Sequence, residues 1–399
     1  MLFKRERKIY KTGVNYRASK DPYFNMFLVN KELFIRPYYP ANYSISDCDF
    51  WDFIGGKRFF RIAISPKDIQ ISNYVYGDKS IVSFSNKIIL SDEYCISDIN
   101  IIRRFNIDIT HYNILNICSV GATETLEYIK KNNLFPNALY DRFNVSYFDV
   151  ASYYCHINVL DWLLNSGLNI EYSYTSIDNA SKNGHINVLD WWLKSNLILK
   201  YTGKSLYWAS KNGHVDVLTW WFKSNLPLKY DESALDSASW NGHINVLNWW
   251  FNSNLPLKYT NSAIDIASNK GYVEILNLWC CSGVELKYSC NSLLFASDNG
   301  NFDILEWWIN SGLPLEYQNY ILISASYKNN INVLEWWRKA GLLYKFDAKW
   351  IWEHYHIFSY CEMNILEWWM HNFSKDIPIK YKIYYNIFKC KSKMCEWLI

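Results

Sequence analysis

One pattern of residues recurs at a fixed interval of 29 positions between residues 175 and 317. It reads A-S-x-x-G-x-(I/V/F)-x-(V/I)-L-x-x-W, and its first copy runs from Ala180 to Trp192. Further copies follow at 209–221, 238–250, 267–279 and 296–308. A period within roughly 20–50 residues is typical of a solenoid, in which each repeat buries its apolar face against its neighbours. The chain is therefore expected to form a continuous stack of repeats rather than a compact ball.

The period continues on both sides of these clear copies. Ala151-Ser152 and Ala325-Ser326 stand 29 residues before the first copy and after the last. Weaker copies are found at 118–129, 365–369 and 394–398. About ten repeats are thus expected over residues 112–399, and the divergent copies at the two ends are expected to act as caps.

Each repeat is predicted to form two short antiparallel helices, which we name helix A and helix B. In the copy at 262–288, Ser262 is a good N-cap residue for helix A. Gly271 permits the tight turn, because a residue without a Cβ enters the left-handed region cheaply. Apolar residues then recur at helical spacing over 273–279, which predicts helix B. Gly283 follows as a C-terminal cap, and the chain runs extended into the next repeat.

These residues resemble the ankyrin repeat. The copy at 262–284 is similar to the family's T-P-L-H-x-A opening and its G-H-x-x-V-V-x-x-L-L-x-x-G continuation. The glycine-histidine step is intact at Gly184-His185, Gly213-His214 and Gly242-His243. The resemblance covers about 70% of the chain and implies an α-helical solenoid that binds other proteins and is not an enzyme.

Two departures from the family affect where binding is expected. The family's histidine slot holds Asp149, Asp178, Asp236 and Asp265, and the period is 29 residues rather than about 33. Slot counting places the missing residues after the position of Tyr288, so the projecting hairpins of the family should be short loops here. Recognition is therefore expected on the concave face formed by the helices A.

A second resemblance concerns the style of the sequence. Its excess of Asn, Ile, Lys and Tyr and its many tryptophans look like the ankyrin proteins of giant DNA viruses of amoebae. The segments 77–79 and 86–90 are similar to the small domain that precedes the repeats in that group. This resemblance implies a viral protein that binds a host or viral partner inside the host cell, in the cytoplasm or alternatively the nucleus.

The part before the repeats divides into two segments. Residues 1–20 carry seven Lys and Arg against the single acid Glu6, which indicates either an import or polyanion-binding arm or a solvated, poorly ordered terminus. Residues 21–111 are predicted to form a small mixed α+β domain. The expected elements are strands at 57–64, 69–76, 81–84 and 87–90 and a helix at 98–105. Nothing there has the spacing of a nucleophile motif, a metal site or a phosphate loop.

Composition limits the function classes. A net charge of only +3 argues against a dedicated nucleic-acid binder. No stretch approaches the roughly 18–20 apolar residues of a membrane span, and no secretory signal is recognisable. The ten cysteines form no C-x-x-C pair and are expected to be reduced thiols of an intracellular protein. We expect no cofactor and no metal, and the protein is expected to be a monomer.

Three periodic residue types allow both a functional and a structural interpretation. Tandem tryptophans such as Trp249-Trp250 are either an aromatic binding stripe or, as we favour, part of the core. Histidines recur every 29 residues, at His156, His185, His214 and His243, which suggests a row of metal ligands. Repeats roughly 8–10 Å apart are too distant for two of these histidines to share one zinc ion. We therefore favour histidines that form hydrogen bonds with the backbone. The row Lys200, Lys229, Lys258 and Lys287 is either a site for a regularly spaced acidic partner or a solvated edge.

The candidate site residues occupy the two variable slots before the turn glycine, near the end of helix A. A recognition surface needs variation on a rigid frame, and Trp240 is the strongest anchor candidate, because binding hot spots favour Trp, Tyr and Arg. The predicted protein-binding residues are Tyr153, Tyr154, Lys182, Lys211, Trp240, Lys270, Tyr327 and Lys328.

Three function classes remain in view. The preferred one is a non-catalytic scaffold that binds a protein of unknown identity. The second is an adaptor that recruits a ubiquitin-ligase component through residues 21–111. The third is an enzyme with an unrecognised site in those same residues.

Overall fold

The computed structural model describes short strands between residues 13 and 95 by their backbone, and then residues 97–105, 109–136, 145–354, 361–383 and 385–386. All statements below concern these residues. The expected last repeat at 394–398 lies outside them, as do the lysines and arginines of the segment 1–20.

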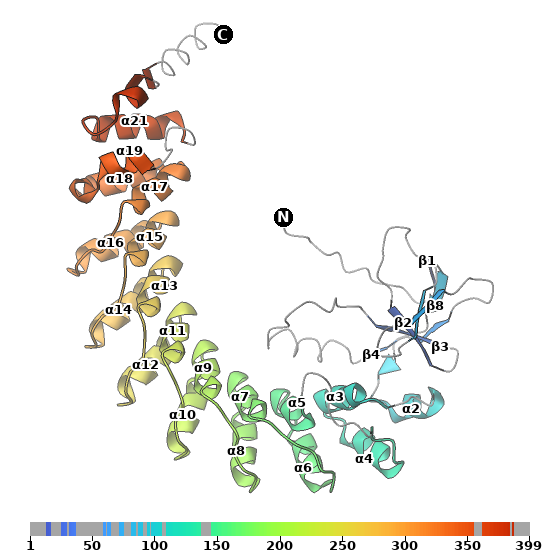
Figure 1. Ribbon diagram of the computed structural model, residues 1–399. Coiled ribbons are helices and arrows are strands. Elements are labelled where there is room, and N and C mark those ends of the chain that lie inside the picture. Colours follow the sequence, from blue (N-terminus) through green and yellow to red (C-terminus); the bar gives the residue numbers. More distant parts are fainter. Residues whose placement is uncertain are drawn as a thin grey trace. The chain divides into compact units, whose positions relative to one another are not determined.

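The strands before the repeats form two antiparallel sheets (Figure 1). The larger sheet has the order β1-β8-β5-β3-β2-β7-β6, and the smaller one pairs β4 with β9. The strand bounds are β1 Gly13–Tyr16, β2 Asn25–Val29, β3 Glu32–Arg36, β4 Phe59–Phe60, β5 Ile62–Ile64, β6 Ser72–Val75, β7 Ile81–Phe84, β8 Lys87–Leu90 and β9 Tyr94–Cys95. Strand β1, from the segment 1–20, pairs with β8 over Gly13↔Leu90 to Tyr16↔Lys87.

The rest of the described chain is helical. After α2 (Ile99–Phe105) come the helices A, namely α3 His111–Ser119, α5 Tyr147–Tyr153, α7 Thr175–Lys182, α9 Lys204–Lys211, α11 Ser233–Trp240, α13 Ser262–Lys270, α15 Asn291–Asp298, α17 Tyr320–Tyr327 and α19 Ala348–His354. The helices B are α4 Thr123–Lys131, α6 Ile157–Asn165, α8 Ile186–Lys194, α10 Val215–Lys223, α12 Ile244–Asn252, α14 Val273–Cys281, α16 Phe302–Asn310, α18 Ile331–Lys339 and α21 Met363–Asn372. A short 3-10 helix, η1 (Leu343–Lys345), precedes α19. The predicted helix pairs are therefore confirmed.

The chain divides into two compact bodies. The N-terminal body holds residues 1–180 and 187–201, and the C-terminal body holds residues 181–186 and 202–399. In the C-terminal body, α9, α11, α13, α15 and α17 pack side by side in one layer, and α10, α12, α14 and α16 form the second layer (Figure 1). In the N-terminal body, α3 packs against α5 and α4 against α6. Neighbouring repeats thus bury one another, as the period predicted.

The second tryptophan of each tandem pair forms the core. Each of these indoles is at most 1% exposed, and the set comprises Trp192, Trp221, Trp250, Trp308, Trp337 and Trp369, with Trp279 in the same slot. Burial of one such ring gives a gross gain of about 4–6 kcal/mol. The core interpretation is confirmed for this slot only. In most pairs the first tryptophan is half-buried, because neighbouring residues on a helix point about 100° apart and cannot both face the core.

Each core indole also makes a hydrogen bond across the repeat boundary. Its N–H donates to the serine of the A-S motif in the preceding repeat, and in Trp279 the acceptor is Ser239 at 2.9 Å. The same bond joins Trp192 to Ser152, Trp221 to Ser181, Trp250 to Ser210, Trp308 to Ser268, Trp337 to Ser297 and Trp369 to Ser326. Burial of an indole N–H is costly unless it is bonded, which explains why the A-S motif and the tryptophan recur together.

The glycine-histidine step joins the turns of successive repeats. The Nε2–H of His214 donates to the carbonyl of Lys182 at 3.0 Å, and that of His243 donates to the carbonyl of Lys211 at 2.9 Å. His156 bonds the carbonyl of Ser119 in the same way. The backbone-bonded interpretation of these histidines is thus confirmed. No group of His, Cys, Asp and Glu with metal-binding arrangement occurs among the described residues.

The lysine row rests on tyrosines. The Nζ of Lys258 lies 4.9 Å from the ring centroid of Tyr230 and donates to the carbonyl of that residue at 3.1 Å. Lys200 sits on Tyr172 and Lys287 on Tyr259 in the same manner. The Tyr230 ring in turn packs on Trp250, with centroids 4.9 Å apart. These three lysines are exposed, as the solvated-edge interpretation expected, and their contacts with the tyrosines were not foreseen.

Aspartates in the family's histidine slot accept hydrogen bonds from the residues that begin the next repeat. Asp265 is 3% exposed and accepts hydrogen bonds from the backbone N–H of Ser289 at 2.9 Å and from the hydroxyls of Ser289 and Ser292. Asp236 accepts likewise from Thr260. The linkers between helix B and the next helix A contain no strand in residues 145–346, which agrees with the predicted loss of projecting hairpins.

Candidate functional site

The predicted site residues fall into separate groups at the ends of the helices A. Tyr153 and Tyr154 belong to the N-terminal body, where their half-buried rings meet edge to face with centroids 4.9 Å apart. The other predicted residues, Lys182, Lys211, Trp240, Lys270, Tyr327 and Lys328, belong to the C-terminal body.

Lys182 and Lys211 flank one indole ring. Their ammonium groups lie 4.5 Å and 4.7 Å from the ring centroid of Trp208, and Lys211 also lies 5.6 Å from the ring of Tyr207. Lys182 is only 9% exposed, whereas Lys211 and the two aromatic rings are half-buried. A cation on an aromatic face gains roughly 0.5–1 kcal/mol at exposed sites. The lysines are therefore held in place by the ring between them.

Trp240 is the most exposed tryptophan among the residues whose side chains the structure describes. It ends helix α11 and is 49% exposed. The exposed Lys270, at the end of α13, places its Nζ 5.9 Å from the Trp240 ring centroid. Among the residues that the structure describes, nothing accepts a hydrogen bond from the Trp240 indole N–H. Trp240 thus offers an apolar ring, a free donor and a neighbouring cation to solvent.

Tyr327 and Lys328 lie at the end of helix α17. Tyr327 is 38% exposed, and Lys328 forms an ion pair of 2.9 Å with Asp298 of the preceding repeat. Asp298 also accepts a hydrogen bond from Ser324 at 2.5 Å. The charge of Lys328 is therefore already compensated, unlike that of Lys270.

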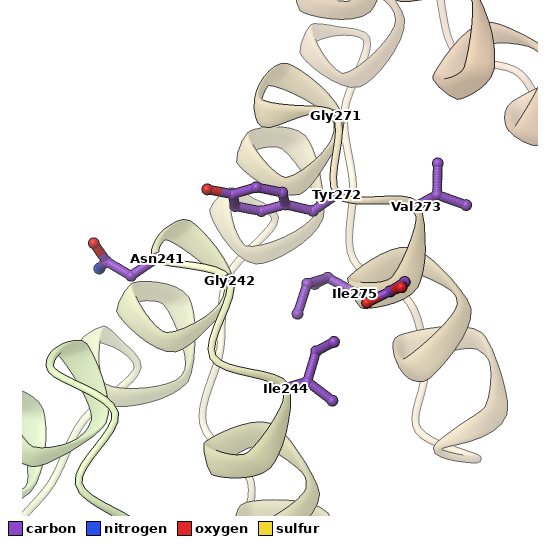
Figure 2. A pocket seen from close by; sticks show the side chains of 8 residues that line it. Asn241, Gly242, Ile244, Gly271, Tyr272, Val273 and Ile275 are labelled. Carbon is purple, nitrogen blue, oxygen red and sulfur yellow. The ribbon is translucent and has the colours of Figure 1, made fainter.

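A hollow of about 540 Å³ opens between the turns of two successive repeats, next to Trp240. It is lined by Asn241, Gly242, Ile244, Gly271, Tyr272, Val273, Glu274 and Ile275. Figure 2 shows the Tyr272 ring reaching toward the turn that holds Asn241 and Gly242, with Ile244 and Ile275 below it. In the sequence, Trp240 directly precedes the first of these turns and Lys270 the second, but neither residue lines the hollow itself.

Tyr272 explains why the hollow occurs at this place. It stands in the slot that holds His214 and His243 in earlier repeats, and it has no ring N–H to donate to the carbonyl of the preceding repeat. Its ring instead lies against Gly242, where a Cβ would come within 3.3 Å of the ring. After His156, His185, His214 and His243, Tyr272 is the first residue in this slot that is not histidine, and it lines the hollow.

Three of the cysteine thiols, those of Cys118, Cys280 and Cys361, are poor candidates for nucleophiles. Burial raises the pKa of the Cys118 thiol, and it raises that of Cys361 to about 11. Burial also raises the pKa of Cys280, which neighbours Cys281 on an exposed helix end. Because their pKa values are raised, these thiols are mostly protonated at neutral pH. The thiolate is the reactive form, so their reactivity is low.

Trp208, Tyr207 and Tyr272 were missed as candidate site residues. The signal was available, because Trp208 stands in a slot that holds Asn179 and Ser237 in the adjacent repeats. This slot also varies in other repeats, where it holds Ile266 and Phe295, and such variation on a regular frame is the signal that was used for the two slots before the turn. The prediction considered only the two slots before the turn and therefore overlooked it.

Comparison with known proteins recognises part of this array. A family model described as ankyrin repeats in many copies matches residues 148–191 and 206–249. The crystal structure of the human ASB11 ankyrin repeat domain is similar at 16% sequence identity, covering 44% of this chain and 86% of that chain with a TM-score of 0.37. The search of curated proteins finds no match. Ankyrin repeats generally mediate protein–protein interactions.

Proposed function

We propose that this chain is a non-catalytic scaffold that binds another protein through the helix A ends of its C-terminal body. The observation that carries this proposal is Trp240, an indole left 49% exposed in a repeat that buries its core tryptophan completely. Tryptophan is among the residues most enriched in binding hot spots. Isolated exposed aromatic residues are common, but this one lies beside the ammonium group of Lys270, which supports an anchor role.

The repeat frame supports binding without rearrangement. Helix α11 packs between α9 and α13, and Trp279 of the following repeat donates a hydrogen bond to Ser239 within α11. A surface that is already formed loses little ordering entropy on association. The frame thus holds Trp240 ready for a partner.

The proposed domain arrangement has a basic segment at 1–20, a small mixed α+β domain at 21–111 and repeats at 112–399. Recruitment of a ubiquitin-ligase component, or an enzyme activity, would have to reside in residues 21–111. The ankyrin family model and the ASB11 structure say nothing of a viral source, so a viral origin and an infected host cell as the setting stay predictions. None of the described helices is both long and apolar enough to cross a bilayer.

Affinity purification with quantitative mass spectrometry tests the proposed surface. Full-length wild type is compared with the Trp240→Ala, Tyr327→Ala double variant in cells that express the protein. Phe222→Ala is the matched control, because Phe222 is also 49% exposed but lies on helix B (α10). We expect the double variant to lose proteins that bind the wild type, and we expect Phe222→Ala to retain them.

Identical partner lists for the wild type and the double variant would reject the helix A surface. Folding of each variant is checked by circular dichroism, since both substitutions remove exposed rings and leave the core tryptophans in place. Ligase subunits that co-purify with a chain lacking residues 112–399 would instead favour the adaptor alternative.

A further inference from the structure

The charges at the helix A ends of the C-terminal body are strongly one-sided. The two variable slots before each turn carry four lysines, Lys182, Lys211, Lys270 and Lys328, against the single acid Asp298. That acid is neutralised by Lys328 at 2.9 Å. Lys182 is only 9% exposed, so the uncompensated positive charge at this surface comes from Lys211 and Lys270. Such a surface attracts a segment of opposite charge.

The aromatic rings orient two of these lysines. Lys211 is held by the rings of Trp208 and Tyr207, and Lys270 leans over Trp240. Among the described residues, no carboxylate forms an ion pair with either lysine. Their ammonium groups are thus positioned and remain available to external carboxylates.

The hollow beside Trp240 favours a different kind of side chain. Its wall contains Ile244, Val273 and Ile275, and the exposed Glu274 at its edge repels a carboxylate. The lining of the hollow is more polar than apolar, but Glu274 disfavours a carboxylate there, so an uncharged side chain fits the hollow better than an acidic one.

From this juxtaposition we infer that the helix A ends from Lys211 to Lys270 bind an acidic protein segment whose apolar residue is flanked by carboxylates. The apolar side chain contacts Trp240 and the Tyr272 hollow, and the carboxylates pair with Lys211 and Lys270. Neighbouring repeats stand roughly 8–10 Å apart, and an extended chain advances about 3.3 Å per residue. The spacing between an acid and the apolar residue is therefore about three residues on each side. This inference rests on the proposed function and specifies its partner.

Fluorescence anisotropy with the full chain tests the inference. The probe is a labelled peptide Glu-Ser-Gly-Phe-Ser-Gly-Glu, compared with peptides in which both Glu are Gln or the Phe is Ser. A labelled oligothymidine of similar length serves as the nucleic-acid comparison. We expect either peptide substitution to weaken binding at least about fivefold, and rising salt to weaken the parent peptide.

Variants of the protein locate the site. The Lys211→Gln, Lys270→Gln double variant is expected to weaken the peptide about five- to tenfold, which is the effect of two exposed ion pairs. Trp240→Ala is expected to weaken it by at least tenfold. Lys223→Gln is the matched control, because Lys223 is exposed like Lys270 but ends the helix B α10, and it should leave the affinity unchanged.

Equal binding of the Glu and Gln peptides, or equal loss in the Lys223 control and the double variant, would overturn the inference. Tighter binding of oligothymidine than of the acidic peptide would overturn it as well, in favour of a nucleic-acid surface. If a purified partner depends on Trp240 but tolerates neutralisation of its acidic residues, the proposed function stands and the acidic assignment is wrong. If no partner depends on Trp240, both are wrong.

Discussion

The indole N–H of Trp250 donates a 3.0 Å hydrogen bond to the hydroxyl of Ser210, which lies one repeat earlier in the chain. Both side chains are fully buried. The same pairing recurs along the array, so one polar contact accompanies each apolar contact between repeats. The hydrogen bond fixes how far one helix B is rotated against the helix A of its neighbour, which apolar packing alone does not specify.

Removal of the acceptor should destabilise the C-terminal body. Ser210→Ala leaves the buried Trp250 N–H without a partner and is expected to lower the free energy of unfolding by about 1–3 kcal/mol. The measurement is urea denaturation followed by tryptophan fluorescence. In the background of Trp250→Phe, which has no donor, the same Ser210→Ala change should cost clearly less. An equal cost in both backgrounds would show that the hydrogen bond contributes nothing.

Two glycines with the same backbone conformation should differ in their tolerance of alanine. Gly213 and Gly283 have φ values of +82° and +74°, but only at Gly213 would a Cβ meet a neighbour, Nδ1 of His243 at 3.0 Å. Gly283→Ala should therefore cost about 1–2 kcal/mol through the left-handed backbone alone. Gly213→Ala should cost more, and the excess should shrink when His243 is also changed to Ala. Thermal denaturation of the single and double variants checks this, and equal losses at the two glycines would contradict it.

Acid should weaken the array partly through His214. Its burial lowers the pKa of the imidazole below the ordinary 6.5, although the hydrogen bond to the Lys182 carbonyl opposes this and the nearby His243 adds to it. The unfolded chain then binds the proton more readily than the folded one. The contribution of His214 is present above the unfolded pKa and is lost as pH falls through the folded value.

The test uses a substitution that the chain itself contains. His214→Asn places in this slot the residue found at Asn301 and Asn330. The loss of stability between about pH 7.5 and pH 5.5 should be smaller in the variant than in the wild type, as measured by urea denaturation at each pH. A larger loss in the variant would show that the imidazolium is the form favoured by the fold.

The lysine row should affect stability and not binding. Lys258→Met removes the ammonium from the Tyr230 ring and its 3.1 Å hydrogen bond to the Tyr230 carbonyl. Because the group is exposed, we expect a loss of only about 0.5–1 kcal/mol, with the affinity for the acidic peptide unchanged. Lys223→Met is the control for a lysine outside the row. Weaker peptide binding by the Lys258 variant would move the binding site to the row.

The sequence by itself determined the repeat and its two helices, but not every helix end, because Ser262 was expected as the N-cap and is the first residue of α13 after the N-cap Asn261. A 29-residue period with helical spacing of apolar residues leaves little choice, because each repeat must bury its apolar stripe against the next. The left-handed turn at Gly271 followed from the absence of a Cβ, and the hydrogen bonds of His214 and His243 followed from the distance between repeats.

Only the tertiary structure decided which tryptophan of a pair is buried and where its N–H is bonded. Tryptophan in both positions is apolar and looks like a core residue, and Trp249 and Trp250 differ in where their N–H groups are bonded, at Thr219 and at the buried Ser210. Other features also depend on side chains that meet across repeats. They are the lysines on tyrosine rings, the contact of Lys182 with the Trp208 ring, and the hollow lined by Tyr272. Such contacts have no spacing signature within one repeat, because they arise from how two repeats are placed against each other.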